Sequence, residues 1–358
     1  KAFDLRAQRR LCNAEPVRGG RQPTGLMNRF DSAQVAKLDM HAALIMMVSV
    51  MNLSQLVPTG TKTQAKKEYA MPSPSVSFEF FPPKSIPAAF RLWDCVQTLA
   101  PLDPSFVSVT YGAGGTTRKL THEAVSALSN QTDLTVAAHL TCVDQTREET
   151  LEIARAYMDQ GVRQIVALRG DAPKGQAQFT PHPEGFASSL ELISALKAEG
   201  VEHIRVGAYP DCHPDATDMK ANVDWLKRKI DAGADSALTQ FFFEADTFLR
   251  FRDHCAAAGI TAPIIPGILP IETWSGVRAF ANACGTPTPR WIDDAFDKAT
   301  RDNRADLLAI SLATELCDTL ITEGVEQLHF YTLNKPEMTR DVCHALGITP
   351  QLELEKVA

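Results

Sequence analysis

Eight short apolar runs recur between residues 76 and 333, and they constrain the fold of this chain more than any other feature. Segments with apolar residues at helical spacing separate the runs, and many of these segments end at a glycine. This repeated strand–helix order with short connections is typical of βα units, in which neighbouring strands run parallel. The predicted strands are 76–81, 106–111, 135–141, 164–168, 204–209, 237–243, 263–269 and 327–333.

Eight such units in a chain of this length predict an α/β fold, a (β/α)8 TIM barrel, whose strand ends form a common rim. A doubly wound open sheet is the alternative, but it needs a glycine fingerprint after its first strand. The first run is followed instead by Phe81-Pro-Pro-Lys84. The predicted helices are 85–99, 117–128, 144–160, 186–199, 215–232, 245–258, 272–283, 289–298, 303–323 and 336–346.

The first 70 residues differ from the rest, so we divide the chain into an N-terminal extension, 1–70, and a barrel domain, 71–358. The extension holds a predicted helix, 31–57, which includes the apolar stretch 42–51 and is followed by a linker-like run. The chain begins with Lys1, and Met71 stands just before the first predicted strand. We therefore expect either that Met71 is the natural start or that 1–70 is an accessory extension.

Composition excludes several classes of function. The net charge of -7 argues against broad binding to nucleic acid or to anionic membranes, which repel an acidic surface. The longest apolar stretch, 42–51, is about half of the roughly 20 residues that a membrane-spanning helix needs. The 8 cysteines show no C-x-x-C pair, which argues against a zinc ribbon or a thioredoxin-type site. We expect free thiols, no bound metal and a cytoplasmic location.

Nearly every predicted strand has a polar side chain in or just after it, and a barrel would gather these at one rim. Glu79 lies among Phe78, Phe80 and Phe81, so burial is expected to raise its pKa and keep it protonated as a general acid. The alternative is a structural carboxylate paired with Lys84 or an arginine. The other polar residues of the set are Thr110, His139, Asp171, Tyr209, Gln240 and Tyr331.

Several of these positions suggest contacts with a charged or heterocyclic ligand. Asp171 is either one half of an ion pair with Arg169 or an anion that stabilises a developing cation. Gln240 offers paired hydrogen bonds to an amide-like ring. The cations at 227–229 are either phosphate contacts or a solvated helix face. The glycine-rich segment 110–118 can bring backbone N–H groups close to an anion.

Taken together, nine motifs in order across about residues 76–348 resemble those of methylenetetrahydrofolate reductase, of the bacterial, flavin-dependent kind. The motifs are Phe78-Glu-Phe-Phe-Pro-Pro83, Val109-Thr-Tyr-Gly-Ala113, Ala138-His-Leu-Thr-Cys142, Ala167-Leu-Arg-Gly-Asp171, Tyr209-Pro-Asp-Cys-His-Pro214, Leu226-Lys-Arg-Lys-Ile-Asp-Ala-Gly-Ala234, Thr239-Gln-Phe-Phe-Phe243, Pro266-Gly-Ile-Leu-Pro270 and His329-Phe-Tyr-Thr-Leu-Asn334.

This resemblance implies FAD at the rim and reduction of 5,10-methylenetetrahydrofolate to 5-methyltetrahydrofolate by NADH or NADPH, in one-carbon metabolism and methionine biosynthesis. It implies that Glu79 is the acid that opens the imidazolidine ring and that Asp171 supports the resulting cation. The implied substrate contacts are Glu79, Gln240, Trp274, Tyr331 and Lys335. The implied FAD contacts are Thr110, Tyr111, Ala113, His139, Leu168, Arg169, Gly170, Asp171, Ala187, Tyr209, His213, Ala216, Asn222, Arg228 and Lys229. A homo-oligomer is also implied.

Four positions depart from the family pattern. Asn222 replaces an Asp near the flavin ribose, and Trp225 replaces an Asn. Trp274 replaces a Phe that shelves the nicotinamide or folate ring, and Lys335 replaces an Arg near the folate tail, which keeps the charge but loses the bidentate fork. Three alternatives stay open: a flavin-free reductase of the same substrate, a non-redox barrel that carries a folate one-carbon unit, and a scaffold that recruits partners through residues 31–57.

Overall fold

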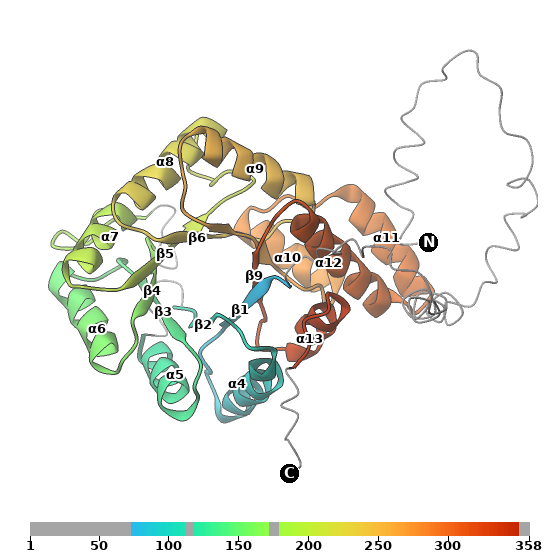
Figure 1. Cartoon of the computed structure of the whole chain (residues 1–358), viewed down its shortest axis with the longest axis horizontal. Coiled ribbons are helices and arrows are strands. Elements are labelled where there is room, and N and C mark those ends of the chain that lie inside the picture. Colours follow the sequence, from blue (N-terminus) through green and yellow to red (C-terminus); the bar gives the residue numbers. More distant parts are fainter. Residues whose placement is uncertain (1–72, 112–117, 172–178, 351–358) are drawn as a thin grey trace, which may run out of the picture. The chain divides into compact units, whose positions relative to one another are not determined.

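The computed structural model describes residues 73–111, 118–171 and 179–350. The strands of these segments form one parallel sheet that curls into a nearly closed barrel, with the helices outside it (Figure 1). The strand order is β7-β6-β5-β4-β3-β2-β1-β9-β8. The strands are β1 (Ser75–Phe80), β2 (Phe106–Val109), β3 (Val136–Thr141), β4 (Gln164–Leu168), β5 (His203–Ala208), β6 (Ser236–Thr239), β7 (Ile264–Ile265), β8 (Gly267–Ile268) and β9 (Gln327–Tyr331).

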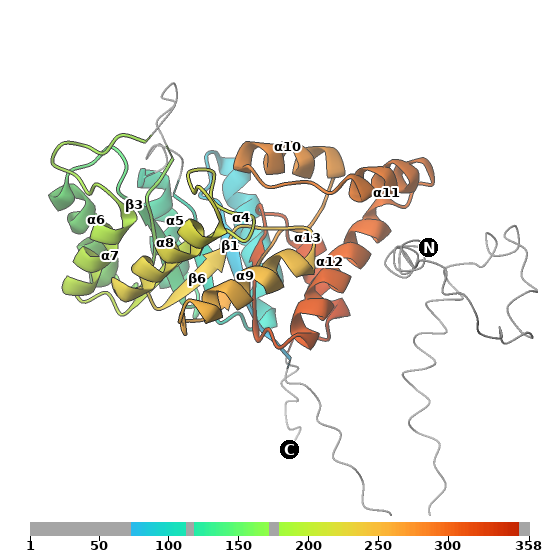
Figure 2. The same cartoon turned by 90° about the horizontal axis from the view of Figure 1, so that it is seen from above.

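The helices alternate with the strands as predicted, and two of them form an insertion between β8 and the last long helix. Figure 2 shows the first helix of this insertion, α10, along the upper edge of the molecule. The helices are α4 (Ile86–Leu99), α5 (Arg118–Gln131), α6 (Arg147–Asp159), α7 (Ser189–Ala198), α8 (Met219–Asp231), α9 (Ala245–Ala257), α10 (Trp274–Cys284), α11 (Arg290–Arg301), α12 (Ala305–Thr322) and α13 (Pro336–Ala345).

The ring closes at Pro266, where the sequence predicted one strand and the structure has two. Proline has no N–H and cannot continue a hydrogen-bonded ladder. β7 pairs with β6, β8 pairs with β9, and the Pro266 carbonyl accepts a hydrogen bond from the His329 N–H at 3.0 Å. The two ends of the sheet are therefore consecutive in the chain, and the predicted (β/α)8 barrel is confirmed.

Local chemistry sets where the helices begin. Thr146 and Glu149 form a reciprocal capping box at the start of α6, with the Thr146 side chain accepting from the Glu149 N–H. The predicted start at residue 144 was wrong, because Asp144 has a left-handed φ of 55° that a helix cannot include. Asp218 caps α8 in the same way, by accepting from the Ala221 N–H.

The barrel interior holds a small apolar cluster, and the Arg205 guanidinium of β5 packs on it, 3.9 Å from the Phe106 ring centroid. Phe106, Ala137, Val166, Leu238 and Ile265 come from five different strands and pack against one another. Larger apolar clusters fill the space between the strands and the surrounding helices. A packed interior of this kind makes the barrel a rigid support for side chains at its rim.

The expectation about residues 1–70 and Met71 lies outside the described residues. Among the helices that the structure describes, none is both long enough and apolar enough to cross a membrane.

Gly267 occupies the tightest point of the seam. A Cβ atom there would lie 2.1 Å from the Thr239 carbonyl oxygen and 2.5 Å from the Tyr331 ring. Because backbone would have to move, Gly267→Ala should lower the free energy of unfolding by about 1–3 kcal/mol, as overpacking does. Urea denaturation of the purified protein measures this change.

Gly207→Ala is the matched control within β5. Its Cβ would meet the Leu168 side chain at 3.5 Å, an ordinary contact, so stability should change by about 0.5 kcal/mol or less. Equal losses in the two variants would contradict the account of the seam.

Candidate functional site at the barrel rim

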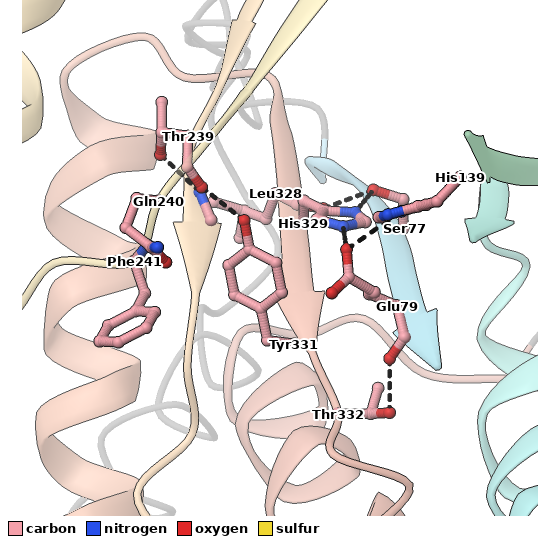
Figure 3. Close-up of polar contacts among 11 residues, drawn as sticks. Ser77, Glu79, His139, Thr239, Gln240, Phe241, Leu328, His329, Tyr331 and Thr332 are labelled. Atoms are coloured by element: carbon pink, nitrogen blue, oxygen red, sulfur yellow. Dashed lines mark hydrogen bonds and ion pairs between the residues drawn. The ribbon is translucent and has the colours of Figure 1, made fainter. Parts of the chain in front are cut away.

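Glu79 lies between two imidazoles inside the barrel, near the C-terminal end of β1 (Figure 3). Its Oε2 atom is 3.3 Å from Nε2 of His139, on β3, and 3.6 Å from Nε2 of His329, on β9. The Glu79 side chain is 14% exposed and that of His329 is fully buried. Among the described residues these imidazoles are the groups within ion-pair distance of Glu79, so the alternative of a pair with Lys84 or an arginine was wrong.

Ser77 and Phe106 fix the position of the His329 ring. Its Nδ1 atom is 2.8 Å from the Ser77 hydroxyl oxygen, which also lies 3.3 Å from the Leu328 carbonyl. The ring stacks on Phe106 with centroids 5.6 Å apart. One ring nitrogen therefore meets a hydroxyl and the other meets a carboxylate, and the tautomer decides which of them donates.

The electrostatics of Glu79 differ from the sequence prediction. Burial raises its pKa, but the His139 and His329 imidazoles outweigh burial and lower the pKa to about 2. Burial lowers the pKa of His329, although Glu79 acts in the opposite direction. The carboxyl group is therefore ionised near neutral pH in this structure. The expectation of a protonated Glu79 was wrong here, because the sequence did not reveal that two imidazoles face it.

The charges of Glu79 and Asp171 act on two buried tyrosines, Tyr331 and Tyr209. Burial raises the pKa of Tyr331 well above its ordinary value, and the charge of Glu79 and then Tyr209 raise it further. Burial also raises the pKa of Tyr209, and Asp171 raises it further. The two carboxylates therefore act on one rim, from β1 and from the end of β4.

Asp171 is exposed and is not the ion-pair partner of its neighbour Arg169. Arg169 instead pairs with Asp215 at 2.8 Å, between the end of β5 and α8. Gly170 between them has a φ of 88°, a conformation that favours glycine. The turn after β4 thus presents Arg169 and Asp171 to different neighbours.

Lys229 on α8 is a buried cation, only 9% exposed. Its ammonium donates to the Gly207 carbonyl at 2.8 Å, and within the described segments no carboxylate lies in ion-pair range of it. Burial, with some repulsion from Arg169, lowers the pKa of Lys229 to about 8. A buried charge without a counter-charge is costly, so this position is suited to an anionic ligand.

The departures at Asn222 and Trp225 have clear roles beside it. The Asn222 amide donates to the Tyr209 carbonyl at 2.8 Å and accepts from the His213 N–H at 3.2 Å, so it holds the loop after β5. Trp225 is 38% exposed, and the Arg228 guanidinium lies 4.7 Å from its ring centroid. The exposed face of α8 thus combines an aromatic ring with a cation.

Gln240 follows β6 and is partly buried. Its backbone N–H donates to the Ala208 carbonyl at 2.8 Å, and its Oε1 accepts from the Phe241 N–H at 3.1 Å. The Tyr331 hydroxyl donates to the Thr239 carbonyl at 2.6 Å, across the seam (Figure 3). Tyr331 therefore fixes the strand end that carries Gln240.

Trp274 does not present a free stacking face, because it is 8% exposed. Its indole N–H donates to Asp293 at 2.7 Å, and its ring stacks on Phe296 with centroids 5.5 Å apart. The exposed aromatic of α10 is Phe280, which is 39% exposed and stacks on Phe241 at 5.5 Å. Of the two aromatic side chains of α10, Phe280 is therefore the one with an exposed ring.

The remaining predicted positions lie around the same rim. Lys335 forms an ion pair with Glu272. Tyr111 is buried and accepts from Arg118 at 3.1 Å, and burial raises the pKa of its hydroxyl. Thr110, Leu168, Ala187 and Ala216 lie at or after the ends of β2, β4 and β5, while Ala113 lies outside the described residues.

Sequence reasoning missed Ser77, His329 and Phe280 as site residues. The alternation of a strand carried the signal for the first two: Ser77 lies two residues before Glu79, and His329 two residues before Tyr331, on the same faces. In the part of the chain that the structure describes, no group of side chains has the arrangement of a metal site. The cysteines there are all free.

Comparison with known proteins identifies the family. A family model described as methylenetetrahydrofolate reductase matches residues 64–347. The 5,10-methylenetetrahydrofolate reductase of Escherichia coli K12 is 44% identical over 279 residues, which cover 78% of this chain and 92% of that protein. Methylenetetrahydrofolate reductase (NADH) 1 of Zea mays is 34% identical over 293 residues, 78% of this chain and 49% of that protein.

A solved structure supports the fold. It is an uncharacterized protein from Clostridium thermocellum described as binding two copies of 5-methyl-5,6,7,8-tetrahydrofolic acid, with a TM-score of 0.52 and 15% identity. It covers 78% of this chain and 95% of its own. The family match and the identities together confirm the resemblance seen in the motifs. The chain belongs to the methylenetetrahydrofolate reductase family and is an oxidoreductase of tetrahydrofolate one-carbon metabolism.

Proposed function

We propose that this reductase uses FAD and converts 5,10-methylenetetrahydrofolate to 5-methyltetrahydrofolate with electrons from NADH or NADPH. The observation that carries the proposal is Glu79 held between His139 and His329 at the rim, because ring opening of the substrate needs a proton donor there. Gln240, Phe280 and Lys335 are the proposed contacts for the pterin edge, an aromatic ring and the acidic folate tail.

Glu79 and its imidazoles act as a unit in this proposal. When one of the imidazoles is doubly protonated, its Nε2 proton passes to Glu79 Oε2 and leaves a neutral ring. Glu79 then passes the proton to the ring nitrogen of the substrate that becomes the leaving amine. The C–N bond to that nitrogen then breaks and leaves a 5-iminium cation, which the exposed carboxylate of Asp171 stabilises. When bound, FAD supplies a two-electron carrier between the nicotinamide and the methylene carbon.

The residues present fit an anionic dinucleotide cofactor. Lys229 is a buried cation without a carboxylate partner among the described residues, and Arg169 and Arg228 lie in the same region. A pyrophosphate would supply the missing counter-charge. Lys229, Arg169 and Arg228 are therefore the residues proposed to hold the FAD phosphates, with His213 and Tyr209 beside them.

Visible spectroscopy under anaerobic conditions tests the flavin directly. The purified protein should bind FAD, and NADH or NADPH should bleach its flavin absorbance. Methylenetetrahydrofolate should then restore the absorbance. A protein that binds no FAD, yet reduces the folate, would instead support the flavin-free alternative. Two observations favour that alternative: Trp225 replaces the expected Asn, and the Asn222 amide is hydrogen-bonded to the Tyr209 backbone.

Lys229→Met should stabilise the protein at about pH 7 by about 1–3 kcal/mol, because it removes an uncompensated buried charge. The pKa of Lys229 is about 8 in the folded protein, compared with 10.5 for an ordinary lysine, which stands for the unfolded chain. The unfolded chain thus binds more protons between these values, and wild-type stability rises with pH across that window. The advantage of the variant should shrink there, as urea denaturation at about pH 7 and pH 10 would measure.

FAD binding provides the control for Lys229. In the wild type, affinity measured by flavin fluorescence should weaken by about tenfold or more between pH 7 and pH 9.5, as the ammonium loses its charge. Lys229→Met should show no such dependence. The assignment would be withdrawn if wild type and variant bound FAD with the same affinity at both values.

Glu79→Gln should separate the two half-reactions. Bleaching by the nicotinamide nucleotide should be kept, because that step needs no proton from Glu79. Turnover of methylenetetrahydrofolate should fall by about 10²-fold or more, the usual cost of losing a general acid. Stopped-flow absorbance measures both rates.

Glu326→Gln is the control, since Glu326 is exposed and precedes β9 at the opposite end of the barrel. It should leave both rates unchanged. Equal losses of both half-reactions in Glu79→Gln would remove the acid assignment.

A further inference from the structure

The turn after β9 bonds back to the strand that carries Glu79. The carbonyl of Glu79 accepts hydrogen bonds from the Thr332 N–H at 3.2 Å and from the Thr332 hydroxyl at 2.7 Å (Figure 3). Two residues later, Asn334 reaches Phe81. Its Oδ1 accepts from the Phe81 N–H at 2.8 Å, and its Nδ2 donates to the Phe81 carbonyl at 2.9 Å.

Asn334 takes over where the strand ladder stops. The β1–β9 register ends with Glu79 opposite Tyr331, two residues before Phe81. Within the described residues, Asn334 is the group that bonds both backbone polar atoms of Phe81. Its amide thus acts as a substitute for one further pair of ladder bonds and fixes the chain just after Glu79.

The backbone of this turn is in an unusual conformation. Leu333 and Asn334 have consecutive left-handed φ values of 51° and 57°. Asparagine tolerates that region, whereas leucine does not favour it, and such residues persist where the surroundings hold them. Here the Asn334 amide bonds the backbone of Phe81, just after β1, and Leu333 packs against the apolar cluster of α10 and α11. Strain held in this way is common at functional sites.

We propose that Asn334 is a positioning residue for Glu79, acting through the backbone of Phe81. The inference rests on the proposed role of Glu79 as the proton donor. The paired bonds fix the end of β1, so the carboxylate keeps its place between His139 and His329. Loss of the Asn334 side chain frees the strand end, and the carboxylate then spends less time in reach of the substrate nitrogen.

Asn334→Gly removes the amide while keeping a residue that accepts a positive φ. Asn303→Gly is the matched control, because Asn303 also has a left-handed φ, 52°, in an exposed turn between α11 and α12. Hydrogen exchange followed by mass spectrometry should show about tenfold faster exchange at Phe81 in Asn334→Gly and no change there in Asn303→Gly.

The catalytic readout is the split between kcat and KM in the full-length enzyme. In Asn334→Gly, kcat for methylenetetrahydrofolate should fall about tenfold, as expected for a small misplacement of a catalytic group. The ratio kcat/KM for the nicotinamide nucleotide should stay unchanged, because it reports only the half-reaction that reduces the flavin. Asn303→Gly should match the wild type in both quantities.

Three results would overturn the inference. Unchanged exchange at Phe81 would show that the amide does not hold the strand end. Faster exchange with an unchanged kcat would show that the held strand end does not position Glu79. A matching fall in kcat/KM for the nicotinamide nucleotide would indicate a general structural role. If the wild type reduced no methylenetetrahydrofolate, both the proposed function and the catalytic role of Asn334 would be wrong. The exchange result would then still show whether the Asn334 amide holds the backbone of Phe81.

Discussion

The contact between the Glu79 carboxylate and two imidazoles governs the chemistry of this rim. Taking a carboxylate out of water is costly, and His139 and His329 more than offset that cost in this structure. The same contact sets what the group can do, because an ionised Glu79 must first receive a proton. Ser77 holds the far side of His329, so the histidine that faces the carboxylate is also anchored to β1.

The barrel makes this contact possible by bringing together strands that are distant in sequence. Glu79, His139 and His329 come from β1, β3 and β9, and β1 lies between β2 and β9 in the sheet. The seam at Pro266 and Gly267 brings β9 close enough for the Tyr331 hydroxyl to reach β6. The turn at Thr332 and Asn334 then secures the end of β1. One strand, β9, therefore contacts Glu79 on one side, through His329, and the end of β6 on the other, through Tyr331.

Much of this was predictable, because the repeat of apolar runs fixes both the fold and the rim at which polar residues gather. The direction of the Glu79 pKa shift could not be predicted, since it depends on side chains from other strands. Trp274 looked like a stacking surface because an aromatic stood at the right place in the motif, yet its contacts with Asp293 and Phe296 bury it. The strand at 263–269 was predicted as one piece, although Pro266 in its middle signalled the break.

The charge state of Glu79 is the most direct test of the account. Difference infrared spectroscopy of wild type minus Glu79→Gln, with isotope-labelled glutamate, reports whether this one carboxyl is ionised. Near neutral pH and without substrate, the account predicts an ionised carboxylate band that persists into mildly acidic buffer. A protonated carbonyl band under the same conditions would contradict it, because the imidazoles would then not be holding the charge.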